Sequence, residues 1–506
     1  MIRYIKNNIV FCCRKFFPAF ILAFLSIGCS EDFLNKNSLT QLSSDTFWKS
    51  EEDVKSALAG VYGQLQFNKL SWMTPSLSTL SDEADRGEYE GFAQGVIEPT
   101  SADVTAVYNS LYQTLASCND FLANIEQVAM ADQDRARYVS EVKFIRALTN
   151  FRLTQYFGDA VLAMEPLTLE NGKRPKSKKE EIFAAVIADL DDAIEGLPDI
   201  AYNGHAVRGT AYAMKGKVLL YMKDYAGAVT AFKGVSNTHF SLSNNLKDVF
   251  IDGTQEKSPE ILFSIRFLAP NNLQDPRWGV DVWYGRGERA IPLQSFVDEF
   301  LSSDGLNISQ SPLYDPKKPF ANRDPRLDVS VLYPGKPWPG YANGFQPSAG
   351  AGTPNGLIIE KFLNKSKFPA QEYSVNPSEQ DWVEIRYADV LLMYAEALNE
   401  TSGPVKEVYD AVNAIRSRPS THMPPIQQGL SKDQMRQTIR FERKIELAFE
   451  GQRYFDLKRW GIIEDVVPKV KNVLGKNKVF LPQHYLWPIP EAALNNNDLL
   501  EQNPGY

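Results

Sequence analysis

Residues 208–236, RGTAYAMKGKVLLYMKDYAGAVTAFKGVS, contain two short helical patterns separated by a turn at Asp224-Tyr225. In both patterns, apolar and small side chains recur at the three- and four-residue spacing of one helix face. The first pattern contains Ala211, Met214, Lys215, Val218 and Tyr221, and the second contains Tyr225, Ala228, Val229 and Phe232. The stretch therefore predicts two short antiparallel helices that cross at small residues.

Such a helix pair resembles a tetratricopeptide unit, although no strict repeat period is kept along the chain. A pair of this kind cannot bury its apolar face alone and must stack on its neighbours. Further helices are predicted from Ser50 to Leu65, at 104–128, 133–157 and 182–197, and again at 384–400, 405–417 and 431–460. Their ends are predicted by N-capping Ser50, capping boxes Ser177/Glu180 and Ser431/Gln434, closing Gly158 and stopping Pro198.

Residues 252–385 have a different composition from the helical parts. This stretch is about a quarter of the chain, yet it holds 15 of the 30 prolines and 4 of the 8 tryptophans. Prolines at this density and short apolar runs predict loops with a few strands. The expected fold is mostly α, with degenerate tetratricopeptide-like helix pairs forming a scaffold and a loop-rich insert containing a few short strands. Within the domain 29–506, we predict an N-terminal helical part at 29–251, the insert at 252–385, and a C-terminal helical part and tail at 386–506.

Residues 1–28 are typical of a secretory signal peptide. A basic start is followed by the apolar run 16–28, which is too short to span a bilayer as a helix. The run ends at Gly28-Cys29, which resembles a bacterial lipobox and predicts acylation of Cys29, although Ser26 stands where an aliphatic residue is usual. Acidic residues follow at once, as in the surface-export signal of Bacteroidetes lipoproteins. An ordinary signal peptide with an incidental cysteine is the alternative.

The charge of the chain argues against nucleic acid as a partner. The formal net charge is −8. Without the four basic residues of 1–28, the remaining body carries four fewer positive charges, which is −12. An acidic surface does not attract phosphate backbones, and it suits neutral or cationic ligands unless a local basic patch overrides it. Cys118 is the one cysteine beyond Cys29, so it has no internal disulfide partner and is predicted to be a small buried side chain.

Four segments, in this order along the chain, resemble the SusD/RagB family of surface lipoproteins. They are PFANRDPRL at 319–327, RYADVLLMYAEA at 386–397, RFER at 440–443 with FEGQRYFDLKRW at 449–460, and WPIP at 487–490 with QNPGY at 502–506. The charged residues of these motifs are predicted to form ion pairs that hold loops onto helices. They are Arg323, Arg326, Arg443 and Arg453 with Asp324, Asp389, Glu396 and Glu450.

The resemblance implies a lipid-anchored protein of the outer membrane that faces the cell exterior. Its expected partner is a SusC-like TonB-dependent transporter, and its expected ligand is an oligosaccharide held on an aromatic surface. RagB-type relatives capture peptides, so a peptide ligand is the alternative. A purely structural scaffold for the transporter is another.

Aromatic side chains cover the apolar faces of sugar rings, and Asp and Arg bond their hydroxyls, so two loop clusters are candidate ligand sites. The first, where Asp82-Glu83 resembles the family's DE loop, contains Trp72, Asp82, Arg86, Tyr89 and Phe92. The second contains Trp278, Trp283, Tyr284 and Arg286, with Trp338 and Tyr341 as further candidates.

No catalytic residue, metal site or cofactor is predicted. The four histidines, His205, His239, His422 and His484, lie far apart in the sequence. The chain has no HExxH, GxSxG or phosphate-loop motif. Two carboxylates can converge in space as they do in glycosidases, so a glycan-acting enzyme is kept as a third hypothesis.

Overall fold

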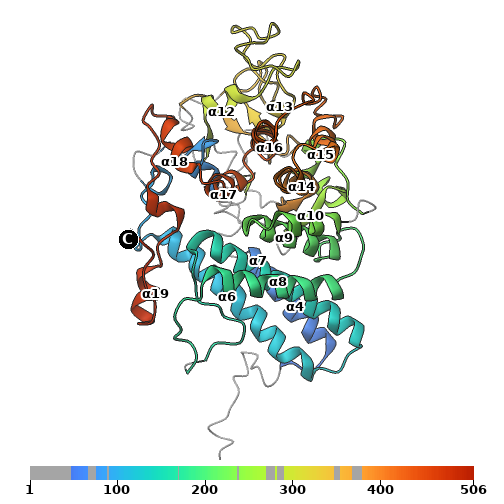
Figure 1. Ribbon diagram of the computed structural model, residues 1–506, viewed down its shortest axis with the longest axis vertical. Helices are drawn as coiled ribbons and strands as arrows, with labels where there is room; N and C mark the ends of the chain where they lie inside the picture. The colour runs from blue at the N-terminus through green and yellow to red at the C-terminus, as the bar shows by residue number, and fades with distance from the viewer. Residues whose placement is uncertain are drawn as a thin grey trace, which may run out of the picture.

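The computed structural model describes residues 47–66, 76–87, 91–168, 170–235, 239–268, 280–281, 290–346, 354–366 and 379–506. The predicted fold class is confirmed, since these residues form mainly helices with a few short strands (Figure 1). The predicted signal peptide and Cys29 lie outside the described residues. The boundaries proposed at 252 and 386 stay predictions.

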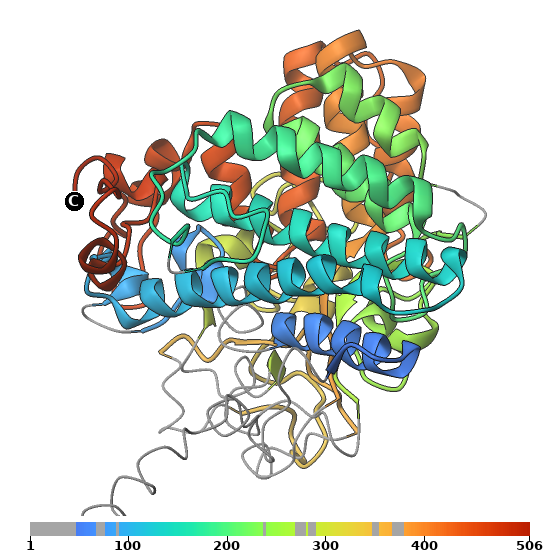
Figure 2. The same cartoon turned by 90° about the horizontal axis from the view of Figure 1, so that it is seen from below.

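The N-terminal scaffold is a series of antiparallel helices that pack in sequence order. They are α4 (Glu51–Gln66), α6 (Ala102–Asn124), α7 (Asp132–Phe157), α8 (Lys179–Gly196), α9 (Arg208–Tyr221) and α10 (Tyr225–Lys233). From α6 onward each helix packs on the next, and α4 packs on α6 (Figures 1 and 2). The stacking that tetratricopeptide-like pairs require is therefore present.

The crossing of α9 and α10 depends on glycine. A Cβ atom on Gly216 would lie 2.4 Å from a ring carbon of Phe232, and one on Gly234 would lie 2.5 Å from the ring of Tyr212. The small residues predicted at this crossing are thus what allows the two helices to approach.

The C-terminal helices are α14 (Tyr387–Ser402), α15 (Lys406–Arg416), α16 (Lys432–Glu446), α17 (Gln452–Arg459), α18 (Ile463–Val466) and α19 (Glu491–Asn496). Helix α14 packs on α10 and joins the two helical parts. The prediction of continuous helix over 431–460 was wrong. Phe449 and Gly451 have φ values of 64° and 72°, a left-handed conformation that ends α16 and redirects the chain into α17.

Two of the three predicted N-caps are confirmed. The side chains of Ser50 and Ser431 accept from the backbone N–H groups of Asp53 and Gln434 at 3.3 Å. Ser177 is not the cap of α8, because its backbone pairs with Ala160 in an isolated β-bridge. The helix starts one residue later, where the N–H of Lys178 donates to Glu181 at 3.2 Å.

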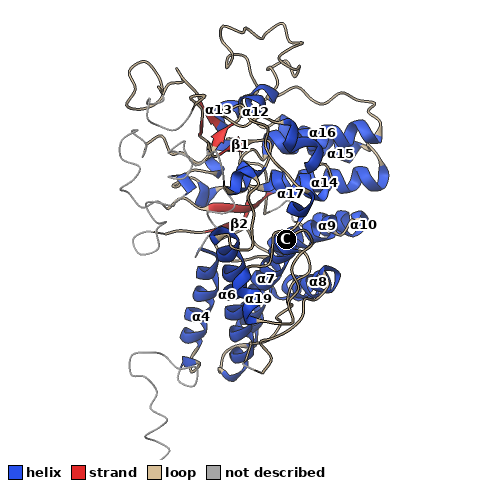
Figure 3. Ribbon diagram, turned by 90° about the vertical axis from the view of Figure 1, so that its left-hand side faces the viewer, coloured by secondary structure: helices blue, strands red, loops and turns tan. Residues whose placement is uncertain are grey.

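The insert contains short antiparallel strand pairs, as predicted. β3 of the insert (Ile291–Pro292) pairs with β1 (Ala84–Asp85) of the N-terminal part. Within the insert, β2 (Ile261–Ile265) pairs with β6 (Trp382–Arg386), and β4 (Val331–Leu332) with β5 (Ile358–Ile359). Two short helices, α12 (Gln294–Glu299) and α13 (Arg326–Ser330), complete it. The described loops and strands of the insert lie to one side of the helices (Figure 3).

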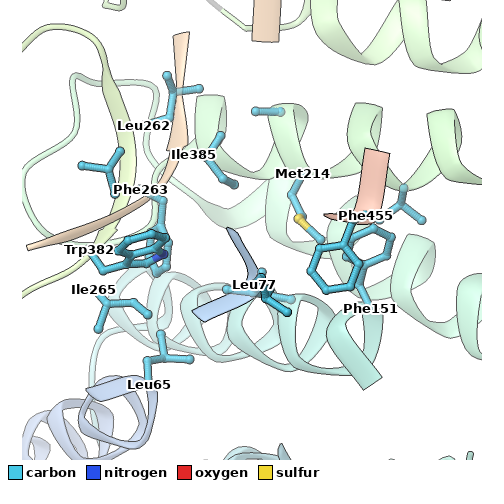
Figure 4. Packing of buried hydrophobic residues seen from close by; sticks show 14 of the residues in the cluster. Leu65, Leu77, Phe151, Met214, Leu262, Phe263, Ile265, Trp382, Ile385 and Phe455 are labelled. Atoms are coloured by element: carbon cyan, nitrogen blue, oxygen red, sulfur yellow. The ribbon is translucent and has the colours of Figure 1, made fainter. Parts of the chain in front are cut away.

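The main core joins the helical scaffold to the β2–β6 pair. Phe263 and Trp382 from these strands lie in one buried cluster with Leu65 of α4, Phe151 of α7 and Phe455 of α17 (Figure 4). Cys118 is fully buried in this core and burial raises the pKa of its thiol, which confirms its prediction as a small apolar side chain. Among the described residues, no helix is both long and apolar enough to cross a membrane.

Candidate ligand-binding surface

The β1–β3 pair brings together the ends of two segments that carry predicted ligand residues. Asp85 lies opposite Ile291 in this antiparallel pair, so the chain that follows β1 and the chain that precedes β3 lie at the same end of the two strands. The segment 88–90 contains Tyr89, and the segment 282–289 contains Trp283, Tyr284 and Arg286. These segments lie outside the described residues, but their points of attachment are adjacent.

A second contact joins the described residues that precede two further segments. The side-chain amide of Gln66, at the end of α4, donates to the carbonyl of Arg266, which follows β2. The next segments along the chain, 67–75 and 269–279, contain Trp72 and Trp278 and also lie outside the described residues. Gln66 and Arg266, which precede these two segments, are therefore in contact although they lie 200 residues apart in the sequence.

The base of the first cluster is held rigidly from the C-terminal part of the chain. Asp85 accepts from the amide of Gln94 at 2.9 Å and from the N–H of Val473 at 3.2 Å. The buried ammonium of Lys478 donates to the carbonyls of Thr79 and Ala84 at 2.6 and 2.7 Å. Burial lowers the pKa of Lys478 to about 8. These contacts give β1 a fixed position.

Asp82 is not available to a ligand, which corrects the sequence prediction. Its side chain is 4% exposed, and both carboxylate oxygens accept from Arg453 of α17, at 2.8 and 2.9 Å. Lys444 of α16 lies 2.8 Å away. Although burial opposes it, the two cations hold the pKa of Asp82 well below its usual range. Asp82 is a structural residue that ties the loop to the C-terminal helices.

Two of the predicted aromatic residues are also structural. Phe92 is buried and packs edge-to-face on Trp487, with ring centroids 5.0 Å apart. Trp338 is buried in a small cluster with Leu332, Phe345, Ile358 and Leu363. Neither ring offers a face to solvent, so both are corrections to the predicted site.

Two predicted residues remain at the described surface. Arg86 is half-buried directly after β1. Tyr341 is half-buried and packs edge-to-face on Phe345, with ring centroids 5.5 Å apart. The predictions for Trp72, Tyr89, Trp278, Trp283, Tyr284 and Arg286 fall outside the described residues and stay predictions.

Glu83, next to Asp82, is a buried carboxyl that stays protonated near neutral pH. It is 0% exposed and accepts from the N–H of Phe449 at 3.3 Å. Burial and the neighbouring charge of Asp82 raise the pKa of Glu83 from 4.5 to about 8, although Arg453 and Lys444 act in the opposite direction. The folded chain therefore keeps a proton that the unfolded chain releases.

This proton makes stability depend on pH. The raised pKa means that the contribution of Glu83 is complete below the unfolded pKa of 4.5 and is lost as the pH rises to about 8. We expect Glu83→Gln, which cannot ionise, to gain stability over the wild type as the pH is raised from about 5 to about 8.5. Urea unfolding midpoints of both proteins across this pH range measure the gap in stability between the variant and the wild type. The exposed Glu491→Gln is the control and should show no such trend. A gap that stays constant or shrinks with pH would contradict the assignment.

The charged residues of the four sequence motifs form buried ion pairs, as predicted. Arg443 contacts Asp389 at 2.8 Å and Asp456 at 3.0 Å. Glu396 and Glu450 are bound by Arg459 and Arg386. Arg323 is the exception, because its guanidinium donates to the backbone carbonyls of Val297, Phe300 and Pro319 and, within the described part of the chain, to no carboxylate.

Several of these motif residues belong to one larger connected network of buried ion pairs. It contains the cations Arg326, Lys361, Arg386, Arg416 and Arg418 and the acids Glu260, Asp324, Glu442, Glu446 and Glu450. Positive and negative groups are equal in number, so the network carries no net charge in spite of its burial. Its members come from the insert, from Arg386 at the end of β6, and from α15, α16 and the residues that follow these two helices, and they serve the fold.

A groove that the sequence did not indicate lies among α4, α7 and the connection from α8 to α9. Its volume is about 790 Å³, and His205 and Glu141 line it. His205 was one of four scattered histidines in the sequence, and no local pattern places it beside a carboxylate 64 residues away. Within the described parts of the chain, no group of three or more His, Cys, Asp or Glu side chains could hold a metal ion.

Comparisons with known proteins cover nearly the whole chain. Residues 263–506 match a family model described as "SusD family", and residues 32–220 match one described as "Starch-binding associating with outer membrane". A SusD-like protein of Formosa agariphila is 27% identical over 96% of this chain and 98% of its own. The starch-binding protein SusD of Bacteroides thetaiotaomicron is 22% identical over 81% of this chain and 79% of its own.

Solved structures show the same fold. A SusD-like carbohydrate-binding protein from Bacteroides fragilis has a TM-score of 0.79 and 25% identity, covering 90% of this chain and 100% of that one. A laminarin-binding SusD-like protein has a TM-score of 0.67 and 22% identity, covering 91% and 100%.

Proposed function

The chain belongs to the SusD-like family, and on that premise we propose that it binds glycans at the cell surface without catalysing their cleavage. The family includes carbohydrate-binding members. In this proposal the aromatic segments of the insert and of the α4–α6 connection hold the sugar, and the protein passes it to a SusC-like TonB-dependent transporter.

The observation that supports this site is that the described residues flanking these segments meet in pairs. One meeting point is the β1–β3 strand pair, and the other is the hydrogen bond between Gln66 and Arg266. Four segments with predicted aromatic residues start from these two points. Sugars need aromatic faces for their C–H surfaces and polar groups for their hydroxyls, and a rigid base fixes both. Trp283 and Trp278 are the proposed ring-stacking residues, with Arg86 as a polar contact.

The proposed location is the outer leaflet of the outer membrane, with Cys29 carrying the acyl chains. The signal-like segment 1–28 and the description of the model matched at 32–220 support this location. Several acyl chains together give stable attachment, because each buried CH₂ contributes about 0.8 kcal/mol.

We expect Trp283→Ala to weaken glycan binding at least tenfold, since a stacking aromatic typically contributes about 2 kcal/mol or more. The ligand is first found by affinity electrophoresis on a panel of neutral and acidic glycans, and the variant is then compared with the wild type by calorimetry. Tyr225→Ala, a half-buried aromatic on α10, is the matched control and should bind normally.

Several outcomes would contradict this proposal. Binding to peptides but to no glycan would favour the peptide-binding alternative. Release of shortened products from a glycan by the purified protein would show an enzyme. Unchanged glycan uptake by cells that carry Trp283→Ala would indicate a scaffold for the transporter.

A further inference from the structure

The groove among α4, α7 and the α8–α9 connection combines an apolar wall with charged groups of both signs. Leu58, Leu197, Pro198, Ile200 and Tyr138 supply the wall. Glu141, His205 and Arg137 also line the groove, and the guanidinium of Arg137 lies over the ring of Tyr138, 4.7 Å from its centroid. A mixture of this kind suits a ligand with both an apolar face and a charged group.

A buried carboxylate orients the histidine. Glu141 is 3% exposed, and its Oε2 atom accepts from the hydroxyl of Tyr62 at 2.7 Å and from Nδ1 of His205 at 2.8 Å. A carboxylate only accepts, so Nδ1 carries a hydrogen. The imidazole side chain is 57% exposed, and among the described residues no group pairs with its Nε2 atom.

Two arginines lie close enough to His205 to oppose its protonation. Arg137 is one turn before Glu141 on α7, and its Nε atom is buried without an acceptor among the described residues. Arg266 lies against Gly204, where a Cβ would be 2.2 Å from its terminal nitrogen, so the guanidinium reaches the residue next to His205.

The charged residues that line the groove balance while His205 is neutral, with Lys55, Arg137 and Arg208 against Asp134, Glu141 and Glu195, so protonation of His205 leaves one positive charge in excess. Facing the imidazole are Glu141 and Arg137 from α7, Tyr62 from α4, and Arg266 after β2. Arg137 also contacts Asp134 at 3.3 Å, and Arg266 lies 3.8 Å from Asp381. The hydrogen bond to Glu141 raises the pKa of His205 in spite of partial burial and the two arginines. Protonated imidazole would present an Nε2–H donor to the groove.

We propose that this groove binds the carboxylate of an acidic saccharide, such as a uronic acid residue, with His205 as donor and Arg137 beside it. The saccharide class rests on the proposed function, whereas the preference for an anion rests on the charges of the groove itself. Pro198 and Ile200, the part of the apolar wall that is not buried, would contact the sugar ring. With His205 protonated, the groove lining carries one excess positive charge on an otherwise acidic protein, which favours an anionic group there.

The test is calorimetry on the whole protein with tetragalacturonate and with its methyl ester, which has the same rings but no charge. At about pH 6 we expect the acid to bind at least about tenfold more tightly than the ester. His205→Gln should remove this preference, so that the acid binds no more tightly than the ester. Glu141→Gln should shift the loss of acid binding to lower pH, because the imidazole then loses its neighbouring negative charge.

His422→Asn is the matched control. His422 is exposed and lies outside the groove, and its φ of 43° is a conformation that asparagine readily adopts. Equal affinity for acid and ester, or equal acid binding by the wild type and His205→Gln, would overturn the proposal. Tetraglutamate binding as tightly through His205 would overturn the saccharide assignment.

The outcomes also separate this inference from the proposed function. Neutral glycans that bind through Trp283, without any preference for the acid, would refute the groove alone. Tetragalacturonate that binds through His205, with no neutral glycan bound, would refute the aromatic site and leave the groove standing.

Discussion

Replacing Arg386 with methionine is expected to lower the free energy of unfolding by about 3–5 kcal/mol, because it leaves buried carboxylates without their cation. Arg386 is 1% exposed and donates to Glu450, Glu260 and Glu446 at 2.7–2.8 Å. It also donates to the carbonyl of Glu446 at 2.9 Å. Methionine fills part of the space and supplies none of these hydrogen bonds.

Urea unfolding followed by circular dichroism measures the loss. Arg174→Met is the matched control. Arg174 contacts Glu165 at 2.6 Å, but the side chain of that acid is 62% exposed. Exposed pairs contribute about 0–1 kcal/mol, so the control should lose little. Equal losses in the two variants would show that the central network does not stabilise the fold in the way its burial implies.

Gly216→Ala is expected to destabilise the protein by about 1–3 kcal/mol, although alanine is normally the better helix residue. The new Cβ would lie 2.4 Å from Cε1 of Phe232, which is itself 4% exposed and packed in the core. Either the ring leaves its position or α9 and α10 move apart, and both changes reduce packing.

Gly60→Ala supplies a control of opposite sign. Gly60 is an exposed position on α4, and a Cβ there would have no atom within 4 Å. This change should stabilise the protein by about 0.5–1 kcal/mol through helix propensity alone. Thermal unfolding of both variants tests the pair. A stabilising Gly216→Ala would mean that α9 and α10 do not need close contact.

Local patterns predicted the helices well, and they predicted the site less well. Periodicity and capping residues act over three or four positions, so Ser431 and the α9–α10 pair could be interpreted directly. Asp82, Phe92 and Trp338 were chosen because polar and aromatic residues in loops often bind ligands. Asp82 is instead bound by Arg453, 371 residues away, and no local pattern reports such a partner.

The sequence by itself determined the mostly helical fold, the tetratricopeptide-like pair at 208–236 and the pairing of motif charges as a class. Only the tertiary structure decided which arginine meets which acid, which aromatic residues are buried, and that Glu141 and His205 share a groove. The physical reason is the range of the interactions. Helix formation depends on neighbouring residues, whereas burial and the pKa values that follow from it depend on contacts between segments far apart in the chain.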